Sequence, residues 1–561
     1  MKFFIILIFF IVIIYSRKLE FVRTKYGKLI GKPCESLPDV TEFLGVPFAT
    51  PPLKNLRFKP PKELKDNYYG ENFKAHTPAN SCPQEIKNIG FAGYDEWQNK
   101  TLKISEDCLQ LNIWVPKKKS GGVIVFIFGG SYSLGSPSLP YYKGDALAYI
   151  TNDIVVNINY RLGVLGFAYY KGYIPGNIGL LDQQMALKWI KENIKGFGGN
   201  PKKITLLGHG SGAASAMAHL YSIGSRNLFK KIIPDSGTIK NNWAYQKNFL
   251  VQENFKTLAS KLKCNIKKPS LMMKCMMKQP ASKLIEVSNK IKNKRQSIFK
   301  NSFLVVESDD VFFKGNVTDM IIRNNMTKNI PILFIRIPSE AAYFMPIYMG
   351  NNQFGCKLDF KKSMDDKANQ CLMKKEHFEN VVGGVVTFFN LKKEAFKEIN
   401  ALYTKSHSIT EYRDKTIRML TDLIFDCEAI EYARKLSVVM KEIVYFHVFN
   451  VRLSNNKWPK WMGVVYGYEL LNYFGHSFSY GKQYNQGILD LERRTSYAYI
   501  KIISDFINND TPIKEWKPFD ATTMEAFYFN KKFVTENVTT YRTVNTFTCR
   551  EWVKIIKKYK K

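Results

Sequence analysis

Short apolar runs alternate with helix-like patterns along much of the chain. Runs of this length that are apolar throughout are typical of strands buried on both faces of a sheet. Five of them predict such strands, at residues 123–128, 154–159, 204–207, 332–337 and 443–449.

A helical pattern lies between the second and third of these runs. Its apolar positions recur near a spacing of three to four residues, and the glycines and proline of residues 196–201 end it. The apolar positions are Leu180, Met185, Leu187, Ile190 and Ile194. Strands that alternate with helices favour one large α/β domain, with a mostly parallel sheet covered on both faces.

The first residues have the pattern of a targeting signal. Lys2 precedes an unbroken apolar run over residues 3–15, which Ser16 and Arg17 follow. Thirteen apolar residues are few for a membrane span, so we expect a secretory signal peptide over residues 1–16 and a single domain over 17–561. An uncleaved signal anchor is the alternative. No later segment has the length and apolarity of a span, and the lysine-rich residues 557–561 exclude a hydrophobic anchor tail.

Composition adds a large positive charge to this picture, a formal net charge of +35. It could attract an acidic partner such as a sulfated glycan, an anionic surface or nucleic acid. It could also reflect a compositional bias towards lysine, which we favour because charge alone argues for non-specific attraction. The lysines are scattered and no aromatic-interleaved nucleic-acid module is visible, so we expect no specific nucleic-acid binding.

The strongest chemical signal follows the strand at 204–207. Residues 204–215 are ITLLGHGSGAAS, in which Gly208-His209-Gly210-Ser211-Gly212 leads into a helix of small residues. A strand, a tight G-x-S-x-G turn and a helix form a nucleophile elbow, whose strained turn exposes a serine hydroxyl. Here the middle position is Gly210.

Long segments of the chain resemble the type B carboxylesterase and cholinesterase family. They are FLGVPFATPP (43–52), SEDCLQLNIWVP (105–116), NYRLGVLGF (159–167) and GNIGLLDQQMALKWIKENIKGFGGN (176–200). The resemblance implies an α/β-hydrolase fold with a large, mostly parallel mixed sheet, flanking helices and a deep aromatic gorge. It implies no cofactor and no metal.

The resemblance also locates three catalytic positions. Gly210 takes the place of the nucleophilic serine, Tyr466 in WMGVVYGYE (461–469) that of the base histidine, and Glu340 in SEAAYF (339–344) that of the acid. A phenol with a pKa of about 10 is a poor proton acceptor at neutral pH. The flanking residues keep the family's register, so Ser211 is not the displaced nucleophile, and we interpret His476 as a surface or packing residue. We therefore predict no efficient ester hydrolysis.

The pocket around these positions is partly retained. The resemblance assigns Gly130, Ser131 and Ser211 to the oxyanion hole, and backbone donors survive a change of side chain. Trp97 takes the place of the family's choline-binding tryptophan, either as a surviving cation site or as an inherited structural ring. His209 replaces an acidic residue, which removes negative charge from the pocket.

The nine cysteines do not reveal their own connectivity. The resemblance implies disulfides Cys82–Cys108, Cys264–Cys275 and Cys427–Cys549, with Cys356 and Cys371 available for a fourth and Cys34 left over. It also implies ion pairs Arg57–Glu106 and Arg161–Asp182. Glycosylation sequons begin at Asn99, Asn316, Asn325, Asn509 and Asn537.

The resulting hypothesis is a secreted, non-catalytic binding protein, analogous to cholinesterase-like adhesion proteins such as the neuroligins. Its partner would be an extracellular protein, an acidic glycan, or a small ester or cationic ligand. The protein could also form a homodimer. Two alternatives remain. One is an active carboxylic ester hydrolase with a non-standard nucleophile such as Ser211. The other is a carrier that sequesters small molecules in the gorge.

Overall fold

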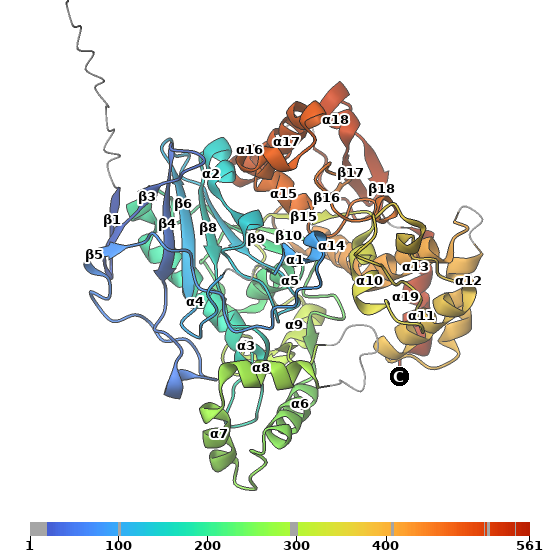
Figure 1. Ribbon diagram of the computed structural model, residues 1–561, viewed down its shortest axis with the longest axis horizontal. Helices are drawn as coiled ribbons and strands as arrows, with labels where there is room; N and C mark the ends of the chain where they lie inside the picture. The colour runs from blue at the N-terminus through green and yellow to red at the C-terminus, as the bar shows by residue number, and fades with distance from the viewer. Residues whose placement is uncertain are drawn as a thin grey trace, which may run out of the picture.

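A long twisted sheet runs through the centre of the protein, with helices on both faces (Figure 1). The computed structural model describes residues 20–98, 102–291, 301–405, 409–509, 511–512, 516–544 and 546–561. The predicted signal peptide and the sequon residue Asn99 lie outside these ranges.

The central sheet has 11 strands in the order β18-β17-β16-β15-β10-β9-β7-β8-β6-β4-β3. The run from β17 to β8 is parallel, and the pairings at both ends are antiparallel. The strands are β3 Lys32–Pro33, β4 Val40–Pro47, β6 Gln110–Pro116, β7 Val123–Ile127, β8 Ile154–Ile158, β9 Ile204–His209, β10 Lys231–Asp235, β15 Ile332–Arg336, β16 Val444–Phe449, β17 Glu525–Phe529 and β18 Tyr541–Thr543.

All five strands predicted from the apolar runs are present, as β7, β8, β9, β15 and β16. Each is buried along its whole length, as expected for a parallel strand covered on both faces. The predicted helix at 180–194 is α4 (Ile178–Asn193), which continues into a 3₁₀ turn at Ile194–Phe197. The expected α/β-hydrolase architecture is therefore confirmed.

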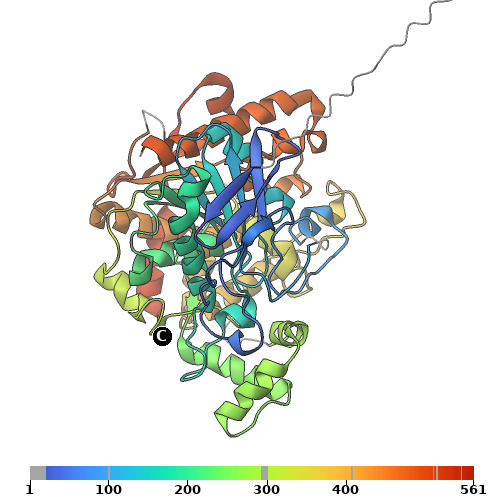
Figure 2. The same cartoon turned by 90° about the vertical axis from the view of Figure 1, so that its left-hand side faces the viewer.

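Helices cover the sheet in two layers (Figures 1 and 2). One face carries α2 (Asp145–Thr151) and α17 (Leu489–Asn509), and the other carries α4 and α5 (Ser211–Ala218). Helix α5 packs directly on β7, β9 and β10. The elbow thus lies at the carboxyl end of a central strand, where open α/β sheets place their ligand sites.

Two helical regions lie outside these layers. The first consists of α6 (Asn248–Lys261), α7 (Pro269–Lys278) and α8 (Ala281–Asn289), and it projects at the bottom of Figure 1. The second gathers the C-terminal helix α19 (Phe547–Tyr559) beside α11 (Lys375–Phe388), α12 (Ala395–Thr404) and α13 (Tyr412–Leu420). A π-helical segment, Thr421–Asp426, joins α13 to α14 (Cys427–Val439).

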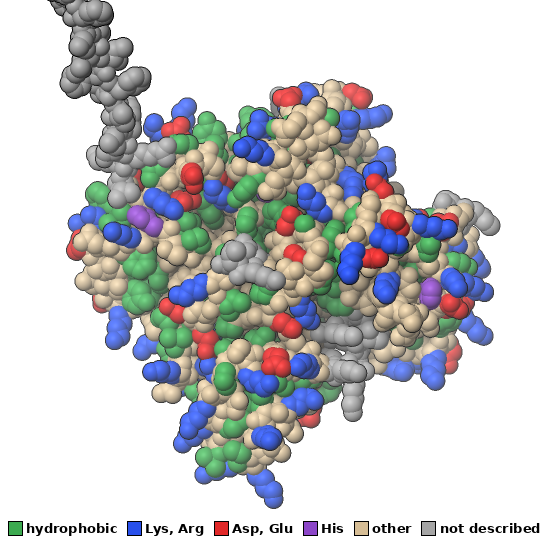
Figure 3. Space-filling model, viewed as in Figure 1, with side chains coloured by type: hydrophobic (Ala, Val, Ile, Leu, Met, Phe, Trp, Pro, Cys, Tyr) green, Lys and Arg blue, Asp and Glu red, His purple; other side chains and the backbone are tan. Residues whose placement is uncertain are grey.

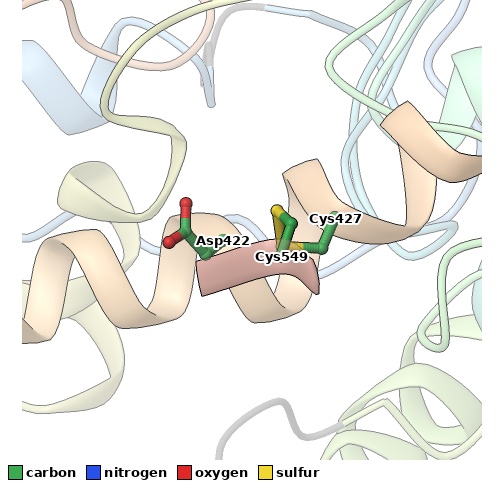
Figure 4. A group of neighbouring side chains, drawn as sticks. All are labelled: Asp422, Cys427 and Cys549. Carbon is green, nitrogen blue, oxygen red and sulfur yellow. A yellow bond between two sulfur atoms is a disulfide. The ribbon is translucent and has the colours of Figure 1, made fainter. Parts of the chain in front are cut away.

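Four disulfides hold the loops and helices together: Cys82–Cys108, Cys264–Cys275, Cys356–Cys371 and Cys427–Cys549. The three pairings that the resemblance implies are confirmed, and Cys356 and Cys371 form the fourth disulfide for which they were available. The remaining cysteine, Cys34, is buried and free. Asp422 lies beside the sulfurs of Cys427 and Cys549 (Figure 4), but these sulfurs are bonded to each other and are not free thiolate ligands.

Both implied ion pairs are present. Arg57 donates to the Glu106 carboxylate at 2.7 and 2.5 Å. Arg161 donates to Asp182 at 2.7 and 2.6 Å, and the Asp182 side chain is completely buried. This second pair ties α4 to the loop after β8.

Several of the predicted sequon asparagines lie at the surface. Of the predicted sequon residues within the described ranges, Asn325, Asn509 and Asn537 are exposed and Asn316 is half-buried. None of the described helices combines the length and the apolar character that a membrane crossing requires.

Candidate functional site

The turn after β9 has the geometry of a nucleophile elbow. Gly210 has φ 54° and ψ −115°, a backbone conformation that disfavours residues with a Cβ atom. Its N–H donates to the Asp235 carbonyl at 2.8 Å, and its carbonyl accepts from the Ala214 N–H at 3.0 Å. At Gly212, a Cβ atom would lie 2.0 Å from the Ile127 carbonyl oxygen, so only glycine allows α5 to approach β7 this closely.

Tyr466 fills the space in front of Gly210. A Cβ atom at position 210 would lie 1.9 Å from the Tyr466 hydroxyl oxygen. The phenol ring is held among aromatic neighbours, with ring-centre distances of 4.5 Å to His209, 5.0 Å to Phe344 and 6.0 Å to Tyr343. The phenol hydroxyl therefore occupies the place where a side chain on the elbow would begin.

The surroundings of Tyr466 keep its hydroxyl protonated. Burial raises the pKa of Tyr466 well above the usual phenol value, and the neighbouring carboxyl groups of Glu340, Glu469 and Asp235 raise it further. A phenol in this state can donate a hydrogen bond but cannot accept a proton at neutral pH.

Glu340 lies in the 3₁₀ turn after β15 and is completely buried. Its Oε1 accepts hydrogen bonds from the Ser236 hydroxyl at 2.8 Å and from the Ile337 N–H at 3.0 Å. Its Oε2 has no hydrogen-bond partner within the described residues. Burial, with Glu469 and Asp235 nearby, raises the pKa of Glu340 well above the usual range. Only one of the two carboxyl oxygens of Glu340 is thus hydrogen-bonded, and the group lies close to Tyr466.

A histidine–glutamate contact lies beside the elbow. The Nε2 of His209 is 3.0 Å from Oε1 of Glu469, and both side chains are buried. Burial lowers the pKa of His209 to about 4 and raises that of Glu469 to about 8. At neutral pH these shifts favour a neutral imidazole and a protonated carboxyl, so neither group carries a charge.

Sequence reasoning missed the role of Glu469. It treated His209 only as the loss of a negative charge, whereas the structure pairs it with a glutamate 260 positions further along the chain. Asp235 is a further buried carboxyl that the sequence did not single out. Burial raises its pKa to about 8, with Glu469 as the next cause.

Two cavities meet at this site. The larger has a volume of about 110 Å³ and the smaller about 40 Å³. Ser131, Phe344 and Tyr466 line both, so these residues form the wall between them. Aromatic rings dominate the larger cavity, which Tyr94, Trp97, Tyr142, Tyr343 and Tyr348 also line.

Trp97 lines the larger cavity, and its ring centre lies 4.8 Å from that of Tyr141 and 6.0 Å from that of Tyr142. Gly467, next to Tyr466, also lies against the edge of the Trp97 ring, because a Cβ atom at position 467 would be 3.3 Å from the indole. The tryptophan assigned by resemblance is thus part of the same pocket wall.

The three residues assigned to the oxyanion hole surround the cavities. Gly130 and Ser131 line the larger one, and Ser131 and Ser211 line the smaller. Ser131 has φ 55°, and its carbonyl accepts a hydrogen bond from the Asn301 amide at 2.8 Å.

Ser211 has no histidine partner within the described ranges. Its hydroxyl accepts a hydrogen bond from the Tyr132 N–H at 3.2 Å. His476 lies elsewhere, buried between Tyr480 and Tyr484, with Nδ1 3.1 Å from the Tyr484 hydroxyl. It is a buried packing residue, which agrees with the interpretation from sequence as a surface or packing residue.

A central parallel sheet with an elbow at the carboxyl end of β9, facing an aromatic pocket, defines an α/β-hydrolase-fold protein. The model of the carboxylesterase family matches residues 18–549. The chain belongs to this family, and its curated relatives include cholinesterases.

Three relatives show the extent of the similarity. The chain is 32% identical to Acetylcholinesterase 4 of Caenorhabditis briggsae, over 88% of this chain and 81% of the relative. It is 35% identical to the Cholinesterase of Mus musculus, over 81% and 73%. It is 33% identical to the Acetylcholinesterase of Bungarus fasciatus, over 84% and 76%.

Proposed function

We propose that this protein is a secreted, cholinesterase-like binding protein that does not hydrolyse esters and holds a small ligand in its gorge. The observation that supports this most directly is the Tyr466 hydroxyl in front of Gly210, where a nucleophilic side chain would lie. Both the attacking group and its base are replaced.

The chemistry of the replacements argues against turnover. Glycine offers no hydroxyl, and the raised pKa of Tyr466 prevents the phenol from acting as a base. Loss of the nucleophile of a triad costs about 10⁶ in turnover, and backbone oxyanion donors with binding alone leave roughly 10³ to 10⁴ over water. Ser211 has a hydroxyl, but its described contacts supply no base.

The lining of the larger cavity favours a neutral, flat, apolar ligand over a choline ester. Within the described chain, no Asp, Glu, Lys or Arg lines this cavity, and the His209–Glu469 pair beside it has no net charge at neutral pH. Trp97 can still add about 0.5–2 kcal/mol of cation–π attraction. A protein of net charge +35 opposes the approach of a cation.

Secretion is part of the same proposal. Four disulfides are typical of proteins that fold in an oxidising compartment. The apolar N-terminal run fits a signal peptide. We propose glycans at the exposed Asn325, Asn509 and Asn537 and at Asn316. Expression in cultured animal cells should yield a glycosidase-sensitive protein in the medium, and retention inside the cells would argue against secretion.

A labelling experiment tests the loss of catalysis. The protein is incubated with a fluorophosphonate probe and a chromogenic ester, with mouse cholinesterase as the active control. We expect no labelled serine and no turnover above that of the denatured protein. Labelling of Ser211 together with turnover would replace this proposal with the alternative of an active hydrolase.

A titration tests the ligand. Calorimetry compares a neutral aromatic ester with choline, in the wild type and in Trp97→Ala and Trp243→Ala variants. Trp243 lines only the smaller cavity and serves as the matched control. We expect the neutral ester to bind more tightly than choline. We also expect Trp97→Ala to weaken binding of the ester more than Trp243→Ala does. If neither ligand binds, the gorge is not the functional site, and a protein partner is favoured instead.

A further inference from the structure

A dense cluster of lysines lies at the tip of the projecting helical region. Residues 261–278 contain six lysines and no acidic residue, whereas the whole chain has 83 basic and 48 acidic residues. The cluster, here called the lysine ridge, comprises Lys261, Lys263, Lys267, Lys268, Lys274 and Lys278, and all six are exposed. Lysine makes up a third of these 18 residues, whereas Lys and Arg together number 83 in the 561 residues of the chain.

The charges of the lysine ridge are not neutralised locally. Within the described residues, none of the six lysines lies within ion-pair distance of a carboxylate. Other lysines of the same region form ion pairs with carboxylates. Lys256 pairs with Glu253 at 3.0 Å, and Lys283 and Lys290 pair with Glu286 at 3.0 and 2.6 Å. The ridge therefore presents its charge to solvent.

The scaffold under the ridge is firmly held. The Cys264–Cys275 disulfide fixes the turn after α6 against the middle of α7, with a Cα–Cα distance of 5.6 Å. Lys263 and Lys274 flank the two bonded cysteines in sequence, so the bridge brings their positions together. On the opposite side of α7, Met272, Met273 and Met276 are buried.

Arg57 attaches this scaffold to the main domain. Its guanidinium donates to the carbonyls of Met277 at 2.8 Å and Gln279 at 2.6 Å, while it also binds Glu106. The end of α7 is thereby fixed, and Lys274 and Lys278 lie one helical turn apart on it, roughly 6 Å. The relative positions of the charges are set by the fold.

We propose that the lysine ridge is a binding site for a linear sulfated polysaccharide. The ridge lies at the projecting end of the molecule, where an extended polyanion can lie along it (Figures 1 and 3). Ammonium groups are compact point charges that suit sulfate groups spaced along a flexible chain. This inference goes beyond the ligand of the gorge and needs only the extracellular location.

Nucleic acid fits the ridge less well. Residues 261–278 contain no aromatic side chain on which bases could stack and no arginine for bidentate phosphate contacts. The proposed extracellular location, which the disulfides support, also favours a sulfated polysaccharide over a nucleic acid.

Immobilised heparin provides the test. The full-length protein is compared with a ridge variant that carries Lys261→Gln, Lys263→Gln, Lys267→Gln, Lys268→Gln, Lys274→Gln and Lys278→Gln. A control variant removes the same charge from exposed lysines dispersed over the chain, namely Lys62, Lys361, Lys393, Lys441, Lys482 and Lys531. Thermal melting verifies that both variants are folded.

We expect the ridge variant to elute at clearly lower salt and its Kd for heparin to rise by at least about tenfold, with a weaker dependence of binding on salt concentration. The control variant should change by less than about threefold. A second measurement uses the unaltered protein, in which bound heparin should protect the ridge lysines from acetylation and leave the control lysines reactive.

Three outcomes would overturn the proposal. One is an equal loss of heparin binding in both variants, which would show that only the total charge matters. Another is uniform protection of all lysines from acetylation. The third is equally tight binding of a DNA duplex of matched charge that the ridge mutations weaken to the same degree.

Discussion

The environment of position 210 makes a simple return of the serine unfavourable. A serine there would place its Cβ atom 1.9 Å from the Tyr466 hydroxyl oxygen, in a backbone conformation with φ 54°. Overpacking of a core site costs about 1–3 kcal/mol, and left-handed strain at a residue other than glycine costs a similar amount. Nucleophile and base positions are therefore coupled by direct contact.

Gly210→Ser should lower the melting temperature and give no fluorophosphonate labelling. The double variant Gly210→Ser/Tyr466→His removes the phenol and restores an imidazole near Glu340, so it should regain much of that stability and become labelled at the new serine. Gly383→Ser is the control for the substitution itself, because a Cβ atom at Gly383 meets no other atom within 4 Å.

The coupling would be refuted if Gly210→Ser alone were as stable as Gly383→Ser and reacted with the probe. Labelling and thermal melting together distinguish this outcome from a variant that does not fold.

The His209–Glu469 pair predicts a pH dependence of stability. The raised pKa of Glu469, about 8, means that the folded state holds its proton more tightly than the unfolded chain. This contribution is complete below the ordinary glutamate pKa and is lost as the pH rises towards 8. His209, with its lowered pKa of about 4, acts in the opposite direction only below about pH 6.5.

Glu469→Gln should therefore make the fall in stability between about pH 6.5 and 8 shallower, by up to about 1.4 kcal/mol per pH unit. Melting temperatures over this range measure the effect, with the exposed Glu394→Gln as the control. Parallel pH profiles for the wild type and Glu469→Gln would contradict the shifted pKa.

At the scale of elements, the buried Arg161–Asp182 pair joins α4 to the loop that follows β8. Its side chains are 4% and 0% exposed, whereas those of the pair Arg23–Glu71 are 69% and 65% exposed. Removal of one partner leaves the other charge buried in the first case and hydrated in the second.

Asp182→Asn should cost about 3–5 kcal/mol of stability, while Glu71→Gln should cost less than about 1 kcal/mol. Denaturant unfolding compares the two variants. A small effect of Asp182→Asn would mean that water or a rearranged backbone reaches Arg161.

The elements differ in how far the sequence predicts them. The five predicted strands are buried on both faces, so their continuous apolar runs are a direct signal. Strand β10 (KIIPD) carries Pro234 and gives a weaker signal, although it pairs with β9 on one side and β15 on the other. The antiparallel strands at the sheet ends, such as β4 and β18, were also not predicted.

For the candidate site, family motifs in the sequence are sufficient to group Gly210, Tyr466 and Glu340 in one region. They did not reveal the contact of His209 with Glu469, because it joins residues from distant segments and leaves no local pattern. Nor did they indicate that Tyr466 points at Gly210 or that it separates two cavities. Side-chain orientation in a packed gorge depends on all its neighbours.

At the scale of the whole molecule, basic side chains are spread widely over the face that Figure 3 shows. With 83 basic and 48 acidic residues, like charges repel one another in the compact state. Dissolved salt screens this repulsion beyond about 10 Å at 0.1 M.

We therefore expect the melting temperature at neutral pH to rise as NaCl increases from about 10 to about 200 mM. Differential scanning calorimetry measures the shift, and the same titration on the ridge variant should give a smaller rise. A melting temperature that falls with NaCl would mean that attractive surface pairs outweigh the net repulsion.

The contact between the phenol and the elbow also has an evolutionary consequence. A lineage that acquired serine first would carry a crowded, less stable protein, and one that acquired histidine first would have a base with nothing to activate. Neither first step is rewarded by activity, so selection for hydrolysis cannot readily retrace the path. Under the proposed binding role, this contact would hold the protein in a non-hydrolytic state while the rest of the scaffold diverges.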